Sequence, residues 1–200
     1  RILYTTTRDE GVPAISSGLV VIPKGVQDPP TIAWAHGTTG AAESCAPTLL
    51  QDPFVSGAMP NTEEALLNGW AVVATDYVGL GADAPHPYLV GQAAARSVLD
   101  AVRASRQLAD VSLGDDVVVW GHSQGGASAL WTGGLAPSYA PELDIVGVAA
   151  MAPAANLPAM IEQLATGRAG TIVGPLVLAG YSAHYDDVHV EDYLLPAATL

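Results

Sequence analysis

The sequence of 200 residues contains a single cysteine, Cys45, and only 7 basic side chains. One cysteine cannot close a disulfide within the chain, so cysteine usage does not indicate an oxidising or a reducing compartment. The sequence has 20 acidic residues, so the formal net charge is −13. A field of this sign repels phosphate backbones. Since Arg96, Arg103 and Arg106 form the only local basic group, we expect no binding to nucleic acid.

Long apolar runs are also missing. No stretch of 18 or more residues is free of both charges and Gly or Pro, so we expect no transmembrane segment. The N-terminus, Arg1-Ile2-Leu3, lacks the layout of a signal peptide. Half of the residues are apolar and 14% are charged, which is typical of a folded chain with a well-buried core. We therefore expect a soluble, already processed chain, and its length predicts one compact domain.

Segments of strand character recur along the chain, with helical segments between them from the middle onward. Ile2–Arg8 and Ser17–Ile22 flank a turn-rich segment from Asp9 to Pro13, which predicts an antiparallel pair at one edge of a sheet. Apolar runs predict four buried strands: Thr31–Ala35, Trp70–Thr75, Val117–Trp120 and Ile145–Ala150. The alternation predicts an α/β fold with a mostly parallel central sheet and flanking helices.

Two helices can be placed between these strands. Asn61 is expected to cap a helix that Gly69 stops. A second helix is expected from about Gly91 to Ala109, with one apolar face. Its other face carries Arg96, Asp100 and Arg103 at pairing distance, and we expect that face to be exposed to solvent.

The most informative motif is Gly121-His122-Ser123-Gln124-Gly125, a Gly-x-Ser-x-Gly pattern between a strand and a helix. A serine hydroxyl is a poor nucleophile and must project from a strained turn, where a base and a carbonyl substrate can both reach it. Such a turn, called a nucleophile elbow, has no room for side chains at positions 121 and 125, and both residues are glycine. A chance match is the alternative, but the strand, the elbow and a helix that begins with small residues occur in the required order.

A second motif, His36-Gly37-Thr38-Thr39-Gly40, follows the strand Thr31–Ala35. In this arrangement the loop helps to bind the oxyanion of a tetrahedral intermediate. We expect one hydrogen-bond donor to be the backbone N–H of Gln124. The other would be the backbone N–H of Thr38, with its hydroxyl as a further candidate. An ordinary Gly/Thr turn is the alternative reading of this loop.

Four motifs together resemble the secretory lipase family: His36-Gly37-Thr38-Thr39-Gly40, Ser44-Cys45-Ala46-Pro47, Asp76-Tyr77-x-Gly79-x-Gly81 and Gly121-His122-Ser123-Gln124-Gly125-Gly126. The likeness extends from Tyr4-Thr5-Thr6 to Asp192-Tyr193-Leu194. It implies an α/β-hydrolase fold with a helical cap, and a secreted protein.

The same resemblance implies roles for individual residues. Ser123 would be the nucleophile, and Thr38 and Gln124 would line the oxyanion hole. Asp76 would shape the loop after its strand and would be structural rather than catalytic. In this family the cysteine of the Cys-Ala-Pro segment can pair with a later one, and any such partner of Cys45 is not in this sequence.

The expected base and acid are harder to find. In this fold they follow the serine on separate later loops, in the order acid, then histidine. His184 and His189 are the only histidines after Ser123, and acidic residues surround both. Asp186 with His189 is one possible acid–base pair, but three residues of separation cannot join two different strand ends. A solvated acidic segment of the cap is the reading that we favour.

The resemblance assigns residues 1–156 to the hydrolase core and 157–200 to the start of the helical cap. The acid, the histidine and the last strands would then lie beyond residue 200, in a separate or missing C-terminal remainder. We expect no cofactor and no metal, because helical metal ligands are usually four residues apart and His184 and His189 are five apart.

The sequence therefore predicts a carboxylic ester hydrolase, a lipase or esterase, that forms an acyl-enzyme on Ser123 and acts on a small ester or a lipid. A serine peptidase or an acyltransferase on the same fold stays possible, because the elbow does not identify the leaving group. A non-catalytic binding domain that lost its base is the alternative from another class.

Overall fold

A computed structural model describes residues 1–51, 53, 60–164, 167 and 170–193 of the chain. Its six strands form one sheet, in the order β1-β2-β4-β3-β5-β6. They are β1 (Ile2–Asp9), β2 (Val12–Val21), β3 (Thr31–Ala35), β4 (Ala71–Thr75), β5 (Asp116–His122) and β6 (Asp144–Met151). The helices are α1 (Thr62–Leu67), α2 (Gly91–Ser105), α3 (Gln124–Tyr139), α4 (Leu157–Leu164) and α5 (Gly170–Ser182), with three short 3-10 helices at Glu43–Cys45, Pro47–Leu49 and Val190–Asp192.

The sheet is parallel through β4, β3, β5 and β6 and antiparallel through β1, β2 and β4. This confirms the predicted hairpin at one edge and the mostly parallel centre. The turn is shorter than expected, because β2 begins at Val12 and Pro13 pairs with Thr7. Gly11, at φ 71°, supplies the left-handed backbone that so tight a turn requires.

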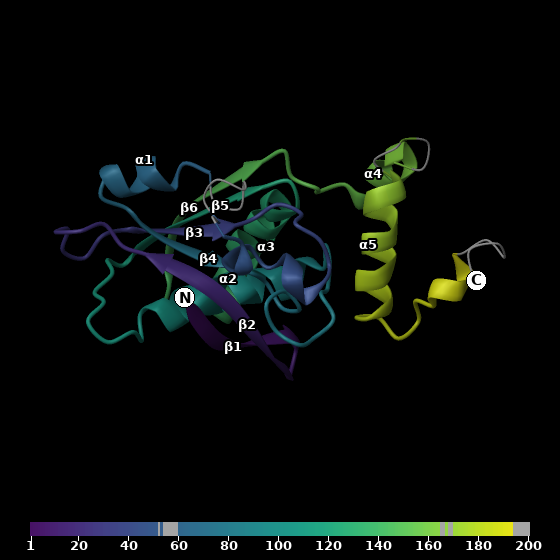
Figure 1. Ribbon diagram of the computed structural model, residues 1–200, viewed down its shortest axis with the longest axis horizontal. Coiled ribbons are helices and arrows are strands. Elements are labelled where there is room, and N and C mark those ends of the chain that lie inside the picture. Colours follow the sequence, from purple (N-terminus) through teal and green to yellow (C-terminus); the bar gives the residue numbers. More distant parts are fainter. Residues whose placement is uncertain (52, 54–59, 165–166, 168–169, 194–200) are drawn as a thin grey trace.

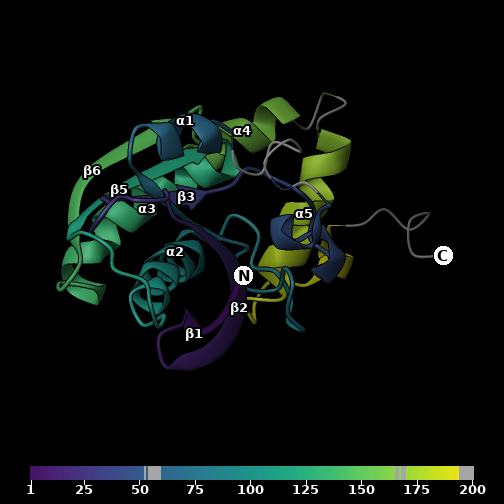
Figure 2. The same cartoon turned by 60° about the vertical axis from the view of Figure 1, so that its left-hand side comes forward.

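Helices cover both faces of the sheet, as Figure 2 shows for α1 on one side and α2 and α3 on the other. The face that α2 and α3 cover buries Val73, Val117 and Val119 against Leu99 and other residues of α2. The face that α1 covers buries Ile32 and Trp34 with Ala65 of α1 and their neighbours. Because alternate residues of a strand point to opposite faces, two covered faces require the continuous apolar runs seen in β3, β4 and β5.

The last strand, β6, differs from the expectation of a fourth buried strand. It lies at the edge of the sheet, and Val146 and Val148 are exposed at 53% and 43%. Within the described residues only β5 pairs with β6, while α3 covers one of its faces. An apolar run alone does not distinguish an edge strand from a central one.

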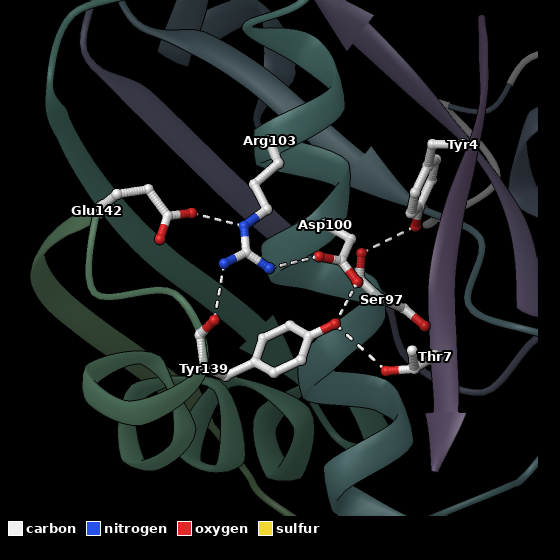
Figure 3. A network of polar contacts seen from close by, with 7 residues as sticks. All are labelled: Tyr4, Thr7, Ser97, Asp100, Arg103, Tyr139 and Glu142. Atoms are coloured by element: carbon white, nitrogen blue, oxygen red, sulfur yellow. Dashed lines mark hydrogen bonds and ion pairs between the residues drawn. The ribbon is translucent and has the colours of Figure 1, made fainter. Parts of the chain in front are cut away.

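The polar side of α2 is not exposed to solvent as expected. Arg96 and Asp100 are both 7% accessible, because β1 and the end of α3 cover this side of the helix. Figure 3 shows the network of polar contacts around Asp100 and Arg103. The Arg103 guanidinium donates to the carboxylates of Asp100 and Glu142, at 2.9 and 2.5 Å, and to the carbonyl of Tyr139 at 2.7 Å. The Tyr139 hydroxyl donates to Asp100 at 2.8 Å.

The helix α1 ends as predicted but does not begin as predicted. Asn61 precedes it in the left-handed region, at φ 63°, and makes no side-chain cap. At the other end Gly69, at φ 81°, donates its N–H to the carbonyl of Leu66 and ends the helix before β4.

The helices α4 and α5 pack against each other beside the sheet rather than on it (Figure 1). They lie in the segment 157–200 that is expected to form the cap, of which residues 165–166, 168–169 and 194–200 fall outside the described part. At Gly180, which is buried, α5 meets the loop before α2. None of the helices in the described residues has the length and hydropathy to cross a lipid bilayer.

Candidate active site

Ser123 lies at the sharp turn between β5 and α3, with φ 58° and ψ −117°. This region of the backbone is unfavourable for a residue with a side chain and is held only by its surroundings. The Ser123 N–H donates to the carbonyl of Met151 at 2.9 Å, and the Ser123 carbonyl accepts from Ala127 at 3.1 Å. The side chain is half-buried, so the turn presents its hydroxyl at the C-terminal end of the sheet.

Three glycines make this turn possible. A Cβ on Gly121 would overlap the backbone of Gly125, and one on Gly125 would lie 2.6 Å from the carbonyl oxygen of His36. A Cβ on Gly126 would lie 2.7 Å from the carbonyl oxygen of Met151. The first turn of α3 therefore touches the ends of β3 and β6 directly, as the small-residue run predicts.

The structure brings the loop His36–Gly40 against this turn. The Cβ position of Gly37 lies 3.8 Å from the Cβ of Ser123 and 3.6 Å from Nδ1 of the exposed His122. Thr38, the next residue, is exposed. Further along, Gly40, at φ 139°, leaves room for Cys45, whose half-buried thiol is free.

Two backbone donors at this junction have no acceptor in the described part of the chain. Within the described residues no hydrogen bond is made by the N–H of Thr38 or by the N–H of Gln124. The first N–H groups of a helix such as α3 have no partner inside the helix and attract negative charge. Two such groups beside one serine can stabilise an oxyanion that forms there.

Asp76, at the end of β4, is fully buried and fully hydrogen-bonded. Its carboxylate accepts from the Ser17 hydroxyl at 2.6 Å, from the Thr48 hydroxyl at 2.5 Å and from the Thr48 N–H at 3.0 Å. These three hydrogen bonds join β2, which carries Ser17, and the short helix Pro47–Leu49 to the end of β4. This geometry agrees with the structural role that the resemblance implies, and Gly79 and Gly81, at φ 82° and 71°, shape the loop that follows.

Sequence reasoning missed two residues of the loop before α2. His86 lies 3.1 Å from the side-chain amide of Gln124, measured from Nε2 to Nε2. The Tyr88 and Thr38 hydroxyls lie 2.7 Å apart. Both residues precede the serine in the chain, where no triad member is sought. The pattern Pro85-His86-Pro87-Tyr88 after a buried strand was the available signal, because two prolines stiffen the segment that carries both side chains.

Burial lowers the pKa of His86 from its usual 6.5 to about 4, so the ring is neutral at physiological pH. His36, the first residue of the loop His36–Gly40, has a buried side chain, and burial also lowers its pKa. The Tyr77 hydroxyl donates to the carbonyl of His36 at 3.0 Å and so holds the start of this loop.

The histidines after the serine lie elsewhere. His184 faces Asp9 at the end of β1, with Nε2 and the carboxylate 3.8 Å apart, and burial lowers its pKa. Asp186 and His189 are both exposed. Among the described residues the Ser123 hydroxyl has no hydrogen-bond partner, so none of these groups serves as its base in this structure. The same residues contain no cluster of three or more His, Cys, Asp or Glu side chains that could hold a metal ion.

Comparison with known proteins gives a consistent result. A family model described as secretory lipase matches residues 58–192. A secreted triacylglycerol lipase of Malassezia globosa, LIP4, is 31% identical over 94% of this chain and 42% of its own length. A protein of Mycobacterium tuberculosis that is named a probable inactive lipase is 29% identical over 78% of this chain and 37% of its own length.

Among solved structures, lipase A of Candida antarctica in its closed state superposes with a TM-score of 0.75 at 27% identity. The match covers 96% of this chain and 45% of that one. The similarity confirms the α/β-hydrolase fold. The chain spans less than half the length of these relatives.

Proposed function

The chain belongs to the secretory lipase family, and from this we propose that it carries the nucleophile half of a serine-dependent carboxylic ester hydrolase. The observation that supports the proposal is the junction of Ser123 with two unused N–H groups. A strained turn presents the hydroxyl, and the donors of Thr38 and Gln124 have no acceptor in the described part of the chain.

In the proposed reaction the Ser123 oxygen attacks the ester carbonyl and its proton passes to a base. The carbonyl oxygen becomes an oxyanion, which accepts hydrogen bonds from the N–H groups of Thr38 and Gln124. The intermediate collapses to an acyl-enzyme, and the alcohol leaves with the proton that the base returns. Water then adds to the acyl group by the same steps, releasing the acid and restoring Ser123.

We assign the base and its orienting acid to sequence beyond residue 200. Two observations support this assignment: the relatives are more than twice as long as the matched segment, and no described side chain bonds the Ser123 hydroxyl. On the same basis we assign residues 1–156 to the hydrolase core and 157–200 to the start of a cap over the site. The name of the Malassezia relative supports a secreted protein that acts on lipid esters.

The test uses the full-length protein and p-nitrophenyl esters of short and long acids. Ser123→Ala should lower kcat by at least about 1,000-fold with the fold intact. Ser138→Ala, on the exposed end of α3, is the matched control and should keep wild-type activity. Hydrolysis that survives in Ser123→Ala would contradict the proposal, and faster cleavage of peptide anilides than of esters would change the substrate class.

The second candidate is a non-catalytic binding domain, which the similarity to the probable inactive lipase favours. The same assay separates the two. An inactive domain gives equal background rates for wild type and Ser123→Ala with every ester, although the folded proteins still bind lipid or ester.

A further inference from the structure

The loop between β4 and α2 reaches both sides of the candidate oxyanion hole. Its residues His86 and Tyr88 are 5% and 2% accessible. The loop is held rigidly, because Pro85 and Pro87 flank His86 and the Tyr88 N–H donates to the carbonyl of His86 at 2.8 Å. A Cβ on Gly79 would overlap the backbone of His86, so the first part of the same loop packs tightly against the segment that carries His86.

The hydrogen bonds of His86 fix its tautomer. Nδ1 lies 2.8 Å from the carbonyl oxygen of Val78, which can only accept, so Nδ1 carries the proton. In the neutral ring Nε2 is then an acceptor, and the amide nitrogen of Gln124 donates to it at 3.1 Å. Since the Gln124 amide oxygen has no partner in the described residues, this bond is what orients the side chain.

Tyr88 acts on the other side. A phenol is a stronger acid than an aliphatic alcohol and therefore the better donor, so the Tyr88 hydroxyl donates to Oγ1 of Thr38 at 2.7 Å. In the described part of the chain Tyr88 makes no other side-chain hydrogen bond. With its oxygen held by Tyr88, the Thr38 hydroxyl is free to turn its own proton toward a substrate.

We infer that His86 and Tyr88 are positioning residues of the oxyanion hole: His86 orients Gln124, and Tyr88 orients the Thr38 hydroxyl so that it becomes a third donor to the oxyanion. This inference rests on the proposed function. It assigns to one stiff loop the task of holding both halves of the hole at a fixed separation, which is the preorganisation that oxyanion stabilisation requires.

The Tyr88–Thr38 pair is tested in the full-length enzyme by a double-mutant cycle. Thr38→Val should lower kcat for a short p-nitrophenyl ester by about 100-fold, as the loss of one oxyanion donor does in other enzymes, and Thr38→Ser should restore most of it. Tyr88→Phe keeps the ring packing and should lower kcat roughly 10-fold with KM nearly unchanged. The double variant should be no slower than Thr38→Val, because Tyr88 acts only through that hydroxyl.

The matched control is Tyr139→Phe, which removes a partly buried phenol hydrogen bond, to Asp100, in the network of Figure 3. It should lower Tm and leave kcat unchanged, which separates positioning from loss of stability. For His86, the Leu variant should lower kcat more than the Gln variant, since only Gln keeps an acceptor for the Gln124 amide.

The inference is overturned by a wild-type kcat in Tyr88→Phe, by additive effects of the Tyr88 and Thr38 variants, or by a change in KM alone. If Ser123→Ala keeps its activity, the proposed function fails and the inference with it. If Ser123→Ala is inactive while Tyr88→Phe and both His86 variants keep full kcat, the inference alone fails.

Discussion

Gly125 packs directly on the backbone at the end of β3: a Cβ at this position would lie 2.6 Å from the carbonyl oxygen of His36 and closer still to that of Ala35. The helix that begins at the nucleophile turn and the strand that leads into the oxyanion loop are thus in contact through main-chain atoms. The distance between Ser123 and Thr38 depends on this contact, and the first prediction follows from it.

Gly125→Ala should force α3 away from β3 and lower both Tm and kcat, because a backbone carbonyl cannot move aside as a flexible side chain can. Gly134 on the same helix is the matched control, since a Cβ there meets nothing within 4 Å. Gly134→Ala should raise stability by up to about 1 kcal/mol and leave kcat unchanged. Thermal unfolding and ester kinetics measure both effects, and equal behaviour of the two variants would contradict this packing.

Asp76→Asn should destabilise the fold without removing the chemistry. The amide puts a donor where the Ser17 and Thr48 groups donate, so a buried bond is lost at a cost of about 2–4 kcal/mol. Urea unfolding measures the loss, and burst titration with an active-site reagent counts the folded sites. A kcat per site that falls by orders of magnitude would instead give Asp76 a part in the reaction.

Acid should destabilise the protein through His86. Its pKa is about 4 in the fold and 6.5 in an exposed chain, so between these values the unfolded chain binds a proton that the native state does not. Stability therefore falls as the pH drops from 6.5 to 4, by at most about 3 kcal/mol from this group. The stability difference between wild type and His86→Gln should shrink over that range. A difference that stays constant would show that the ring titrates alike in both states.

Gly180 allows α5 to lie on the backbone of Tyr88, where a Cβ would be 2.5 Å from the Tyr88 nitrogen. Gly180→Ala should loosen this contact and speed hydrogen exchange in the amides of α5. Gly174→Ala, on the same helix, has no atom within 4 Å of the new Cβ and should not change the exchange. If α5 belongs to a cap, Gly180→Ala should also change kcat, because α5 rests on the residue that holds Thr38.

Much of the fold could be predicted from local patterns. The run Thr31–Ala35 is buried on both faces and forms a strand with those bounds, and Gly69 ends a helix as glycine commonly does. The nucleophile turn could be predicted because it has no room for a Cβ at positions 121 and 125, and the sequence therefore has glycine at both.

Other features depended on what packs against a segment. The spacing of Arg96 and Asp100 on α2 predicts a solvent-exposed pair, but β1 and α3 bury both side chains. The sequence of α2 alone does not indicate that other elements pack on this side of the helix. The exposed side of β6 reflects its place at the sheet edge. His86 and Tyr88 reach Gln124 and Thr38 across 38 and 50 positions of the chain, a proximity that only the folded sheet creates.

The central claim is that Ser123 is the nucleophile, and covalent labelling tests it most directly. The full-length protein is treated with a fluorophosphonate, digested and analysed by mass spectrometry. We predict one phosphonyl adduct per molecule, on the peptide that contains Ser123, formed in step with the loss of ester hydrolysis. Loss of activity with the adduct on another residue, or ester hydrolysis that continues with Ser123 fully labelled, would contradict the account.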